Sequence, residues 1–318
     1  MTRALVFPGQ GAQTIGMGRD LAFAHPEARA VFDAVDAALG EDLSGLIWNG
    51  AQDTLTLTRN AQPALMATSV AALRALEAGG LSVATHAAMV AGHSLGEYSA
   101  LVAAGSLSLE DAVRLLRLRG EAMQDAVPAG RGAMAALLGL DADAVRGIAA
   151  EASGDGVCEA ANDNDPAQVV VSGDTAAVER AVELAKAAGA KRAVMLPVSA
   201  PFHCALMAPA AQAMADALDR VEIRDPVVPV VANVTAAPAT DAATIRDLLV
   251  RQVTGAVRWR ESVAAMAAAA VTETWEIGAG KALSGMVRRI DRSIATRSVG
   301  TPDDVAAALE SLHEGKEG

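Results

Sequence analysis

A serine stands between two glycines at a point where the chain changes from an apolar run to a helix-like stretch. The pentapeptide Gly-His-Ser-Leu-Gly occupies residues 92–96, and the preceding run, HAAMVAGH at 86–93, has the composition of a buried strand. Glycines on both sides allow a sharp strand-to-helix turn that leaves a serine exposed at the edge of a sheet. We therefore expect an α/β protein in which Ser94 is a nucleophile and the N–H of Leu95 faces a developing oxyanion. A tight turn with a solvated serine is the alternative.

Strands and helices alternate in much of the remaining chain. Residues 4–7 (ALVF) have the pattern of a buried strand, and helical patterns follow at 17–39 and at 63–78, where Pro63 suits a first turn. Three later segments continue the alternation: a strand at 226–234, a helix at 241–252 and a strand at 271–280. Such alternation indicates a parallel sheet covered by helices. We expect an α/β-hydrolase-like catalytic subdomain with two parts, residues 1–127 and 198–318.

A different order of elements interrupts this alternation. The segments read strand, helix, strand, strand, helix, strand, at 132–140, 141–152, 156–163, 167–173, 174–189 and 191–197. This order within about seventy residues is typical of a ferredoxin-like unit. We therefore expect residues 128–197 to form an inserted small subdomain.

Composition and charge exclude several classes of function. The 318 residues carry a formal net charge of −12 without a basic stripe, so a nucleic-acid partner is not expected. The longest apolar run, at 263–271, is too short to span a membrane, and the N-terminus lacks the apolar core of a signal peptide. Cys158 and Cys204 lack the spacing of a metal site. The sequence thus predicts two reduced thiols, no metal and a cytoplasmic protein.

A serine nucleophile needs a base, and His203 is the best candidate among the five histidines. It follows a strand and two prolines that stiffen the chain, whereas the side chain of His93 is expected to point away from the adjacent serine. A lone histidine in an apolar stretch is also compatible with a core position. In an α/β-hydrolase an acid lies between the serine and the histidine. Here the acids before His203 all fall in the inserted unit: Asp155, Asp163, Asp165 and Asp174. The usual triad is therefore not expected.

Arg119 lacks an acidic partner on its own predicted helix. Ser108 and Asp111 form a capping box at the start of that helix, and Arg114 and Arg117 each have a glutamate four residues away for a surface pair. Arg119 has apolar residues three and four positions away on both sides. A guanidinium on an apolar face keeps its proton and needs an anion. That anion is either a bound substrate or a distant acid of the core.

Seven motifs along the chain resemble those of one enzyme family. They are VFPGQGAQ, QPALMA, AGHSLGEYSALVAAG, RLRGEAMQ, PFHCALM, RQVTGAVRW and EIGAGKALSGMVRR. In this order they are similar to the malonyl-CoA:acyl carrier protein transacylases of bacterial fatty-acid synthesis and to the related acyltransferase domains of polyketide synthases. Each motif alone is weak, whereas the ordered set is specific.

The resemblance implies a ping-pong reaction that uses no cofactor. Ser94 takes the malonyl group from malonyl-CoA, and the malonyl-enzyme passes it to the phosphopantetheine thiol of acyl carrier protein. The family uses a Ser–His dyad, which implies a backbone carbonyl near Gln252 as the partner of His203. It also implies that the backbone N–H of Gln10 lies beside that of Leu95 in the oxyanion hole.

The resemblance further assigns the substrate pocket. Arg119 is implied to hold the free malonyl carboxylate in a bidentate manner. Gln62 and Asn162 are implied to line the pocket, and Phe202 resembles the first residue of the malonyl-selecting Phe-His pair of related domains. Separately, four cations cluster on the acidic chain: Lys191, Arg192, Arg288 and Arg289. We expect them to meet an acidic, transiently bound carrier protein, although each also fits a solvated basic face.

Three other functions fit part of this pattern. A serine thioesterase or esterase would share Ser94 and His203 but would gain nothing from a buried Arg119. A stand-alone polyketide acyltransferase would carry out the same chemistry for another carrier protein. A carrier-docking protein with an inactive site would not need Gln10 together with the other site residues, which are Ser94, Arg119 and His203. We expect an active enzyme that is a monomer.

Overall fold

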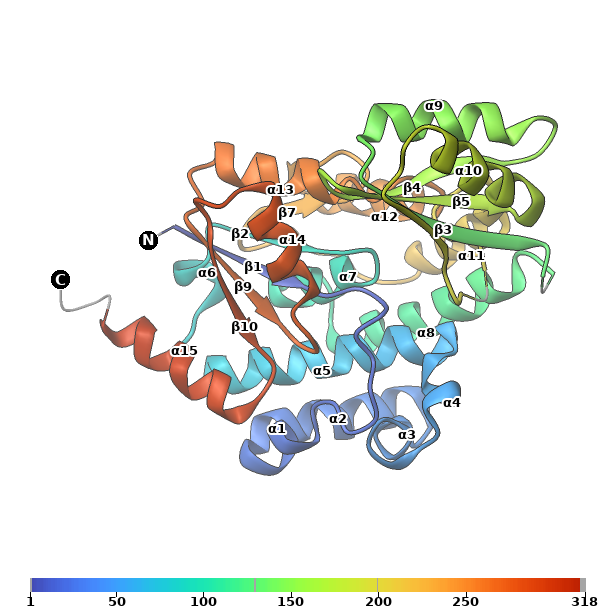
Figure 1. The fold of residues 1–318 in the computed structure, drawn as a ribbon. Coiled ribbons are helices and arrows are strands. Elements are labelled where there is room, and N and C mark those ends of the chain that lie inside the picture. The colour runs from blue at the N-terminus through green and yellow to red at the C-terminus, as the bar shows by residue number, and fades with distance from the viewer. Residues whose placement is uncertain (1, 129, 199, 315–318) are drawn as a thin grey trace.

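Two β-sheets organise the chain in this computed structural model, which describes residues 2–128, 130–198 and 200–314 (Figure 1). The larger sheet has the strand order β10-β9-β1-β2-β7-β8, and the smaller one has the order β4-β5-β3-β6. The strands are β1 Arg3–Phe7, β2 Met89–Gly92, β3 Gly132–Leu138, β4 Cys158–Asp165, β5 Gln168–Asp174, β6 Arg192–Met195, β7 Val230–Ala232, β8 Ala237–Ala239, β9 Glu273–Ile277 and β10 Ala295–Val299. The predicted mixed α/β class is confirmed.

Helices connect these strands and cover the large sheet on both faces. They are α1 Arg19–Ala24, α2 Pro26–Leu39, α3 Leu43–Asn49, α4 Gln52–Thr56, α5 Thr58–Ala78, α6 Val83–His86, α7 Gly96–Ala103, α8 Leu109–Asp125, α9 Ala142–Ser153, α10 Thr175–Ala187, the 3-10 helix η1 Ala205–Met207, α11 Ala208–Leu218, α12 Ala242–Thr254, α13 Trp259–Ala268, α14 Ala282–Ile290 and α15 Pro302–Glu314. Leu5 and Phe7 pack in the core that includes α5, α7 and α8, whereas Ala4 and Val6 pack with α13 and α14. This alternation is the period of two expected for a strand buried on both faces. No helix in the described ranges has the length and apolar run needed to cross a membrane.

The centre of the large sheet brings two loops together. β1 is parallel to both β9 and β2, and its register pairs Phe7 with Gly92. The N–H of His93 continues this pairing by donating to the Phe7 carbonyl at 3.0 Å. The segments that follow β1 and β2, which carry Gln10 and Ser94, therefore emerge side by side. The carboxyl edge of a parallel sheet is where ligands bind in open α/β folds.

The small sheet is antiparallel and has its own apolar core. Its elements follow the order β3, α9, β4, β5, α10, β6, and every pair of neighbouring strands is antiparallel. Valines from the sheet and the helices, including Val171, Val145 and Val178, pack together in this core. Figure 1 shows α9 and α10 on the outer face of this sheet, at the upper right.

The end of β4 joins the two sheets through four consecutive buried polar residues, Asn162–Asp165. Each also has a partner outside the small sheet: Asn162 forms a parallel β-bridge with Val257, Asp163 binds Arg260, Asn164 binds His93 and Asp165 binds Arg289. Arg260 approaches both oxygens of the Asp163 carboxylate, the bidentate geometry of a strong ion pair. The small sheet is therefore held to the rest of the chain by hydrogen bonds and ion pairs.

Several predicted elements have different bounds in the structure. The predicted helix at 17–39 is divided into α1 and α2 at His25, whose φ of −128° is extended because a proline follows it. The predicted strand at 86–93 begins only at Met89, because the residues before it form α6. The predicted strand at 226–234 shortens to the three residues of β7.

The helix predicted at 63–78 begins five residues earlier, so Pro63 lies inside α5 and not in its first turn. A proline has no N–H for the carbonyl four residues before it, which belongs to Arg59. Arg117 of α8 donates to this carbonyl through Nη1 at 2.7 Å and replaces the missing helical bond. The same guanidinium pairs with Glu41 at 2.7 Å. The expectation of a surface pair between Arg117 and the glutamate four residues ahead was wrong.

Candidate active site

Ser94 occupies a strained turn between β2 and α7. Its φ of 51° lies in the left-handed region, which non-glycine residues rarely adopt outside functional turns. The flanking glycines leave no space for a side chain: a Cβ on Gly92 would lie 1.9 Å from the Gly96 carbonyl carbon, and one on Gly96 would lie 2.2 Å from the Phe7 carbonyl oxygen. The strand, the turn and the helix can therefore pack this closely only with glycine at both positions.

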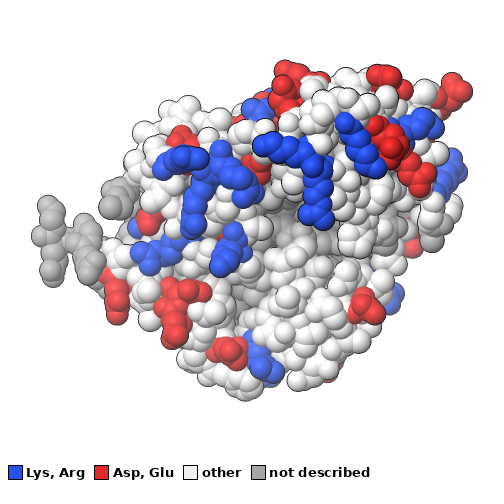
Figure 2. All heavy atoms as spheres, in the orientation of Figure 1, with Lys and Arg blue, Asp and Glu red and all other residues white. Residues whose placement is uncertain are grey.

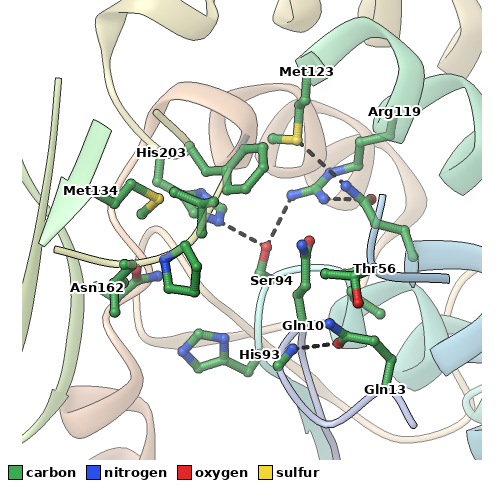
Figure 3. A pocket seen from close by; sticks show the side chains of 17 residues that line it. Gln10, Gln13, Thr56, His93, Ser94, Arg119, Met123, Met134, Asn162 and His203 are labelled. Carbon is green, nitrogen blue, oxygen red and sulfur yellow. Dashed lines mark hydrogen bonds between the residues drawn. The ribbon is translucent and has the colours of Figure 1, made fainter. Parts of the chain in front are cut away.

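His203 meets this serine as the base of a dyad. Its Nε2 lies 2.8 Å from Ser94 Oγ (Figure 3). Its Nδ1 lies 2.9 Å from the backbone carbonyl of Gln252. A carbonyl only accepts, so Nδ1 carries the proton and Nε2 is free to accept from the serine hydroxyl. Gln252 lies in the last turn of α12, where a carbonyl lacks a helical donor. Among the described residues, no carboxylate is bonded to His203, in agreement with a dyad and not a triad.

The surroundings keep His203 neutral in the free protein. Burial, followed by the nearby charge of Arg119, lowers the pKa of His203 to about 3, against an opposing effect of the hydrogen bond to Gln252. A neutral imidazole is the form that can accept the proton of Ser94. An anion placed beside Arg119 would offset the effect of the Arg119 charge and raise the pKa of His203.

Arg119 projects from α8 into the same space and is 1% exposed. Nη1 donates to Gln62 Oε1 at 2.7 Å, and Nη2 donates to Gln252 Oε1 at 2.8 Å and to Ser94 Oγ at 3.2 Å. Nε has no hydrogen-bond partner in the described part of the chain, where no acid forms an ion pair with this guanidinium either. Arg119 is thus a buried cation held by neutral amides, which can bind a carboxylate next to the nucleophile.

These side chains converge on a cavity of about 410 Å³, a size typical of small-molecule sites. Figure 3 shows Ser94, His203 and Arg119 directed toward its centre. The other predicted pocket residues also line it: Gln10, Gln62, Leu95, Asn162 and Phe202. Gln10 lies on the loop after β1, and Leu95 lies at the start of α7. In the described part of the chain, neither of their backbone N–H groups has an acceptor.

Most of the chain matches one family of acyltransferases. Residues 4–295 match the family model described as acyl transferase domain. The chain is 47% identical over 312 residues to the malonyl CoA-acyl carrier protein transacylase of Bacillus subtilis (strain 168), with 98% of this chain and 97% of that one covered. The chain belongs to the malonyl-CoA:acyl carrier protein transacylases. The predicted resemblance and enzyme class are confirmed.

Further relatives of this transacylase agree in sequence and in structure. The Escherichia coli (strain K12) protein of the same name is 48% identical over 307 residues, covering 96% of this chain and 98% of that one. The crystal structure of an acyl-carrier-protein S-malonyltransferase from Bartonella henselae superposes with a TM-score of 0.96 at 54% identity, covering 98% and 100% of the two chains. A malonyl-transacylase solved in complex with its type II polyketide synthase acyl-carrier protein has a TM-score of 0.95 at 43% identity, covering 98% and 100%.

The four predicted docking cations of the transacylase lie on two separate elements. Lys191 and Arg192 are exposed at the start of β6, one edge of the small sheet, whereas α14, which carries Arg288 and Arg289, contacts β4 at the other edge. Arg289 is not a free cation, since its Nε donates to Asp165 at 2.8 Å. Figure 2 shows Lys and Arg side chains gathered over α13 and α14 and beside a hollow in this face, while the lower part of the face carries few charges.

Several polar residues of this transacylase site were not identified from the sequence. Asn233, just after β7, accepts the N–H of Ser94 through Oδ1 at 2.7 Å and donates through Nδ2 to the Gly92 carbonyl at 2.7 Å. Glu97, on α7, is 3% exposed, and burial raises its pKa to about 7. A glutamate in the otherwise uncharged helix 96–103 was a usable signal. The sequence offered no comparable signal for Asn233.

Proposed function

We propose that this chain transfers the malonyl group of malonyl-CoA to the phosphopantetheine thiol of acyl carrier protein through a malonyl ester of Ser94. The observation that carries the proposal is the guanidinium of Arg119, buried, without an acid partner in the described chain, and 3.2 Å from the Ser94 hydroxyl. A substrate with a free carboxylate next to its reacting thioester supplies the missing anion at that place. An acetyl thioester does not.

In the first half-reaction, His203 Nε2 removes the proton of Ser94 Oγ as the oxygen attacks the thioester carbon. The negative charge that develops on the carbonyl oxygen is stabilised by the backbone N–H groups of Leu95 and Gln10 and by the N-terminus of α7. The C–S bond then breaks, and the CoA thiolate takes from His203 the proton that came from Ser94. The carbon is left bonded to Ser94 Oγ as an ester.

In the second half-reaction, the thiol of the carrier protein replaces CoA and the same steps run in reverse. His203 takes the thiol proton, the sulfur attacks the serine ester, and Ser94 Oγ leaves with that proton. Arg119 holds the malonyl carboxylate throughout, so the ester carbonyl stays directed at the two N–H donors. Neither half-reaction uses a cofactor.

The remaining pocket residues select and orient the acyl group. Phe202, which is 9% exposed, narrows the cavity beside His203 and leaves little space for a branched acyl chain. Gln62 holds Arg119 through its Oε1, and Asn162 presents a polar side chain to the same cavity. Lys191, Arg192 and Arg288 contact the acidic carrier protein, with weak, salt-sensitive binding.

We also propose a division of the chain that follows this chemistry. Residues 1–127 and 198–318 form an α/β-hydrolase-like catalytic subdomain that carries the dyad, Arg119 and both oxyanion donors. Residues 128–197 form the inserted subdomain. The strand order β4-β5-β3-β6, with α9 and α10 on one face, favours a ferredoxin-like assignment. The cavity lies between them, lined by Met134 and Asn162 from one side and Ser94 from the other.

The test is a transfer assay with malonyl-CoA and a phosphopantetheinylated acyl carrier protein. We expect malonyl carrier protein to form with the wild type and not with Ser94→Ala. Free malonate released faster than malonyl carrier protein forms would identify a thioesterase instead. Carrier proteins of fatty-acid and polyketide synthesis, compared at equal concentration, distinguish the two pathways by their kcat/KM.

A further inference from the structure

The carboxylate of Glu97 lies behind the nucleophile and is shut off from water. Glu97 stands three residues after Ser94 in the first turn of α7, a helix that is buried along its whole length. Its Oε2 accepts two hydrogen bonds, from the backbone N–H of Asn233 at 3.0 Å and from Gln252 Nε2 at 2.9 Å. A single carboxylate oxygen thus joins the nucleophile helix, the end of β7 and the last turn of α12.

The first of these donors, Asn233, supports the strained turn. Its side chain is bonded to the N–H of Ser94 and to the carbonyl of Gly92, one residue from each arm of the turn. The positive φ of Ser94 costs free energy and persists only where surrounding contacts hold it. Since Glu97 binds the backbone of Asn233, it fixes the position from which that side chain reaches the turn.

The second donor, Gln252, connects to both other functional groups. Its backbone carbonyl accepts from His203, its Oε1 accepts from Arg119, and its Nε2 also donates to the Ser94 carbonyl at 3.0 Å. An amide has an accepting end and a donating end. Glu97 binds the donating end, which turns the accepting end toward Arg119. The opposite orientation would place N–H groups against N–H groups.

From these contacts we infer that Glu97 is a positioning residue of the acyl-transfer reaction, which holds Ser94 through Asn233 and holds Arg119 and His203 through Gln252. Glu97 bonds neither Ser94 Oγ nor the His203 ring in the structure. It acts by fixing the two amides that touch them. The inference rests on the proposed function for the choice of substrates, because the contact between Gln252 and Arg119 matters most for a thioester that carries a carboxylate.

Variants at position 97 separate the hydrogen bonds from the charge. In Glu97→Gln the amide oxygen still accepts both bonds, so we expect kcat/KM for malonyl transfer to remain within several-fold of wild type. In Glu97→Ala the acceptor of both bonds is lost, and the donating end of Gln252 keeps only the Ser94 carbonyl as a partner. Misplacement of this kind by about 1 Å costs on the order of a hundredfold in rate. We expect such a loss for malonyl-CoA and a several-fold smaller one for acetyl-CoA.

A matched control is Glu276→Ala. Glu276 is also buried and also accepts two hydrogen bonds, from the N–H groups of Leu283 and Ser284 at 3.0 and 2.8 Å. Unlike the donors to Glu97, neither of these residues is bonded to Ser94, His203 or Arg119. Its loss should lower the melting temperature and leave the malonyl-to-acetyl ratio of kcat/KM unchanged. All rates are divided by the active-site concentration, titrated as the acyl-enzyme formed in a burst, so that partial unfolding is removed from the comparison.

Two results would overturn the inference while wild type still transfers malonyl. One is a Glu97→Ala enzyme with wild-type kcat/KM per active site. The other is an equal loss for both thioesters that Glu97→Gln does not rescue, which would mark Glu97 as structural. If Glu97→Ala yields no folded protein, Glu97→Asp, whose carboxylate is one methylene short of both donors, should show the same malonyl-biased loss. A wild type without malonyl transfer would refute the proposed function. The Glu97 variants would then be compared with acetyl-CoA alone, and Glu97→Ala should still lose rate because Asn233 no longer holds Ser94 in place.

Discussion

Replacing Arg119 by alanine tests the substrate directly, because the reaction with acetyl-CoA serves as an internal reference. In the free protein, the guanidinium donates hydrogen bonds to Gln62, Gln252 and Ser94 and forms no ion pair with an acid of the described residues. Binding of malonyl therefore creates an ion pair in a buried site, and Arg119→Ala leaves the substrate carboxylate there without a partner. The loss of one member of such a pair costs about 2 to 5 kcal/mol.

At about 1.4 kcal/mol per factor of ten, this cost lowers kcat/KM for malonyl transfer by roughly 30-fold to several thousand-fold. Acetyl-CoA carries no carboxylate, so its kcat/KM should stay unchanged or rise as the unpaired cation is removed. The assay measures both thioesters in wild type and variant, with a melting curve for each protein. Some loss of stability is expected, because two buried amide oxygens lose their donor at about 1 to 3 kcal/mol each.

Arg117→Ala is the matched control for removing a buried arginine from α8. Arg117 is 8% exposed and is bonded to Arg59, Asn60 and Glu41, none of which lines the cavity. This variant should melt at a lower temperature and keep the malonyl-to-acetyl ratio of wild type. An equal fall for both thioesters in Arg119→Ala would show that Arg119 does not bind the malonyl carboxylate and is a structural residue.

Three further predictions concern the dyad and its surroundings. Ser94→Ala should lower acyl transfer by a factor on the order of 10⁶. The variant should still fold, since the turn depends on its glycines. Carrier acylation at a tenth of the wild-type rate would exclude Ser94 as the nucleophile. Loss of a true triad acid lowers kcat by ~10⁴. We expect a far smaller fall for each of four variants: Asp155→Asn, Asp163→Asn, Asp165→Asn and Asp174→Asn. A fall of that size at one of them would reveal a triad. The stability of wild type should change little between pH 4.5 and 6.5 through Glu97 and His203. The Glu97 contribution, with a pKa raised by burial to about 7, is full below its ordinary value of 4.5 and is lost as pH rises through 7. The His203 contribution, with a pKa lowered by burial and Arg119 to about 3, is full above 6.5 and is lost as pH falls. Glu97→Gln removes the first contribution. The free energy of unfolding of this variant, measured in urea, should therefore fall relative to wild type by about 1.4 kcal/mol per pH unit as the pH is lowered across this window. Parallel curves for the two proteins would contradict the raised pKa of Glu97.

The sequence predicted those parts of the site that local patterns specify. The strand, the glycines and the helix around Ser94 follow from composition and spacing, and the structure has them in that order. The isolation of Arg119 from acids of its own helix also followed from the three- and four-residue offsets. A departure from the hydrolase pattern predicted that His203 has no carboxylate partner. The first two of these inferences depend on residues close together in the chain, and the third depends on the order of the serine, the acids and the histidine along it.

Contacts between distant segments could not be predicted in this way. Pro63 was expected to begin a helix. It lies inside α5 because Arg117, 54 residues further along the chain, supplies the hydrogen bond that the proline cannot donate. No local pattern shows that bond. Asp163 and Asp165 were considered as catalytic acids, whereas they form ion pairs with Arg260 and Arg289 that join the small sheet to the rest of the chain.

The strands at the two edges of the large sheet were missed for a related reason. β10 has mostly intermediate or exposed residues, and β8 has three residues, one of them a proline. Neither has the apolar run that identifies β1 or β2. Edge strands depend on a neighbouring strand that the local sequence does not show. The network around Glu97 was missed likewise, since Asn233 and Gln252 lie more than a hundred residues from it.

The most direct test of the central claim is to trap and discharge the acyl-enzyme. Wild type is mixed briefly with malonyl-CoA, quenched and digested, and the peptides are weighed by mass spectrometry. One malonyl group should be found on the peptide that contains Ser94, should disappear when phosphopantetheinylated acyl carrier protein is added before the quench, and should persist when only buffer is added. A malonyl group on another residue, or one that buffer removes as fast as the carrier protein does, would contradict the account.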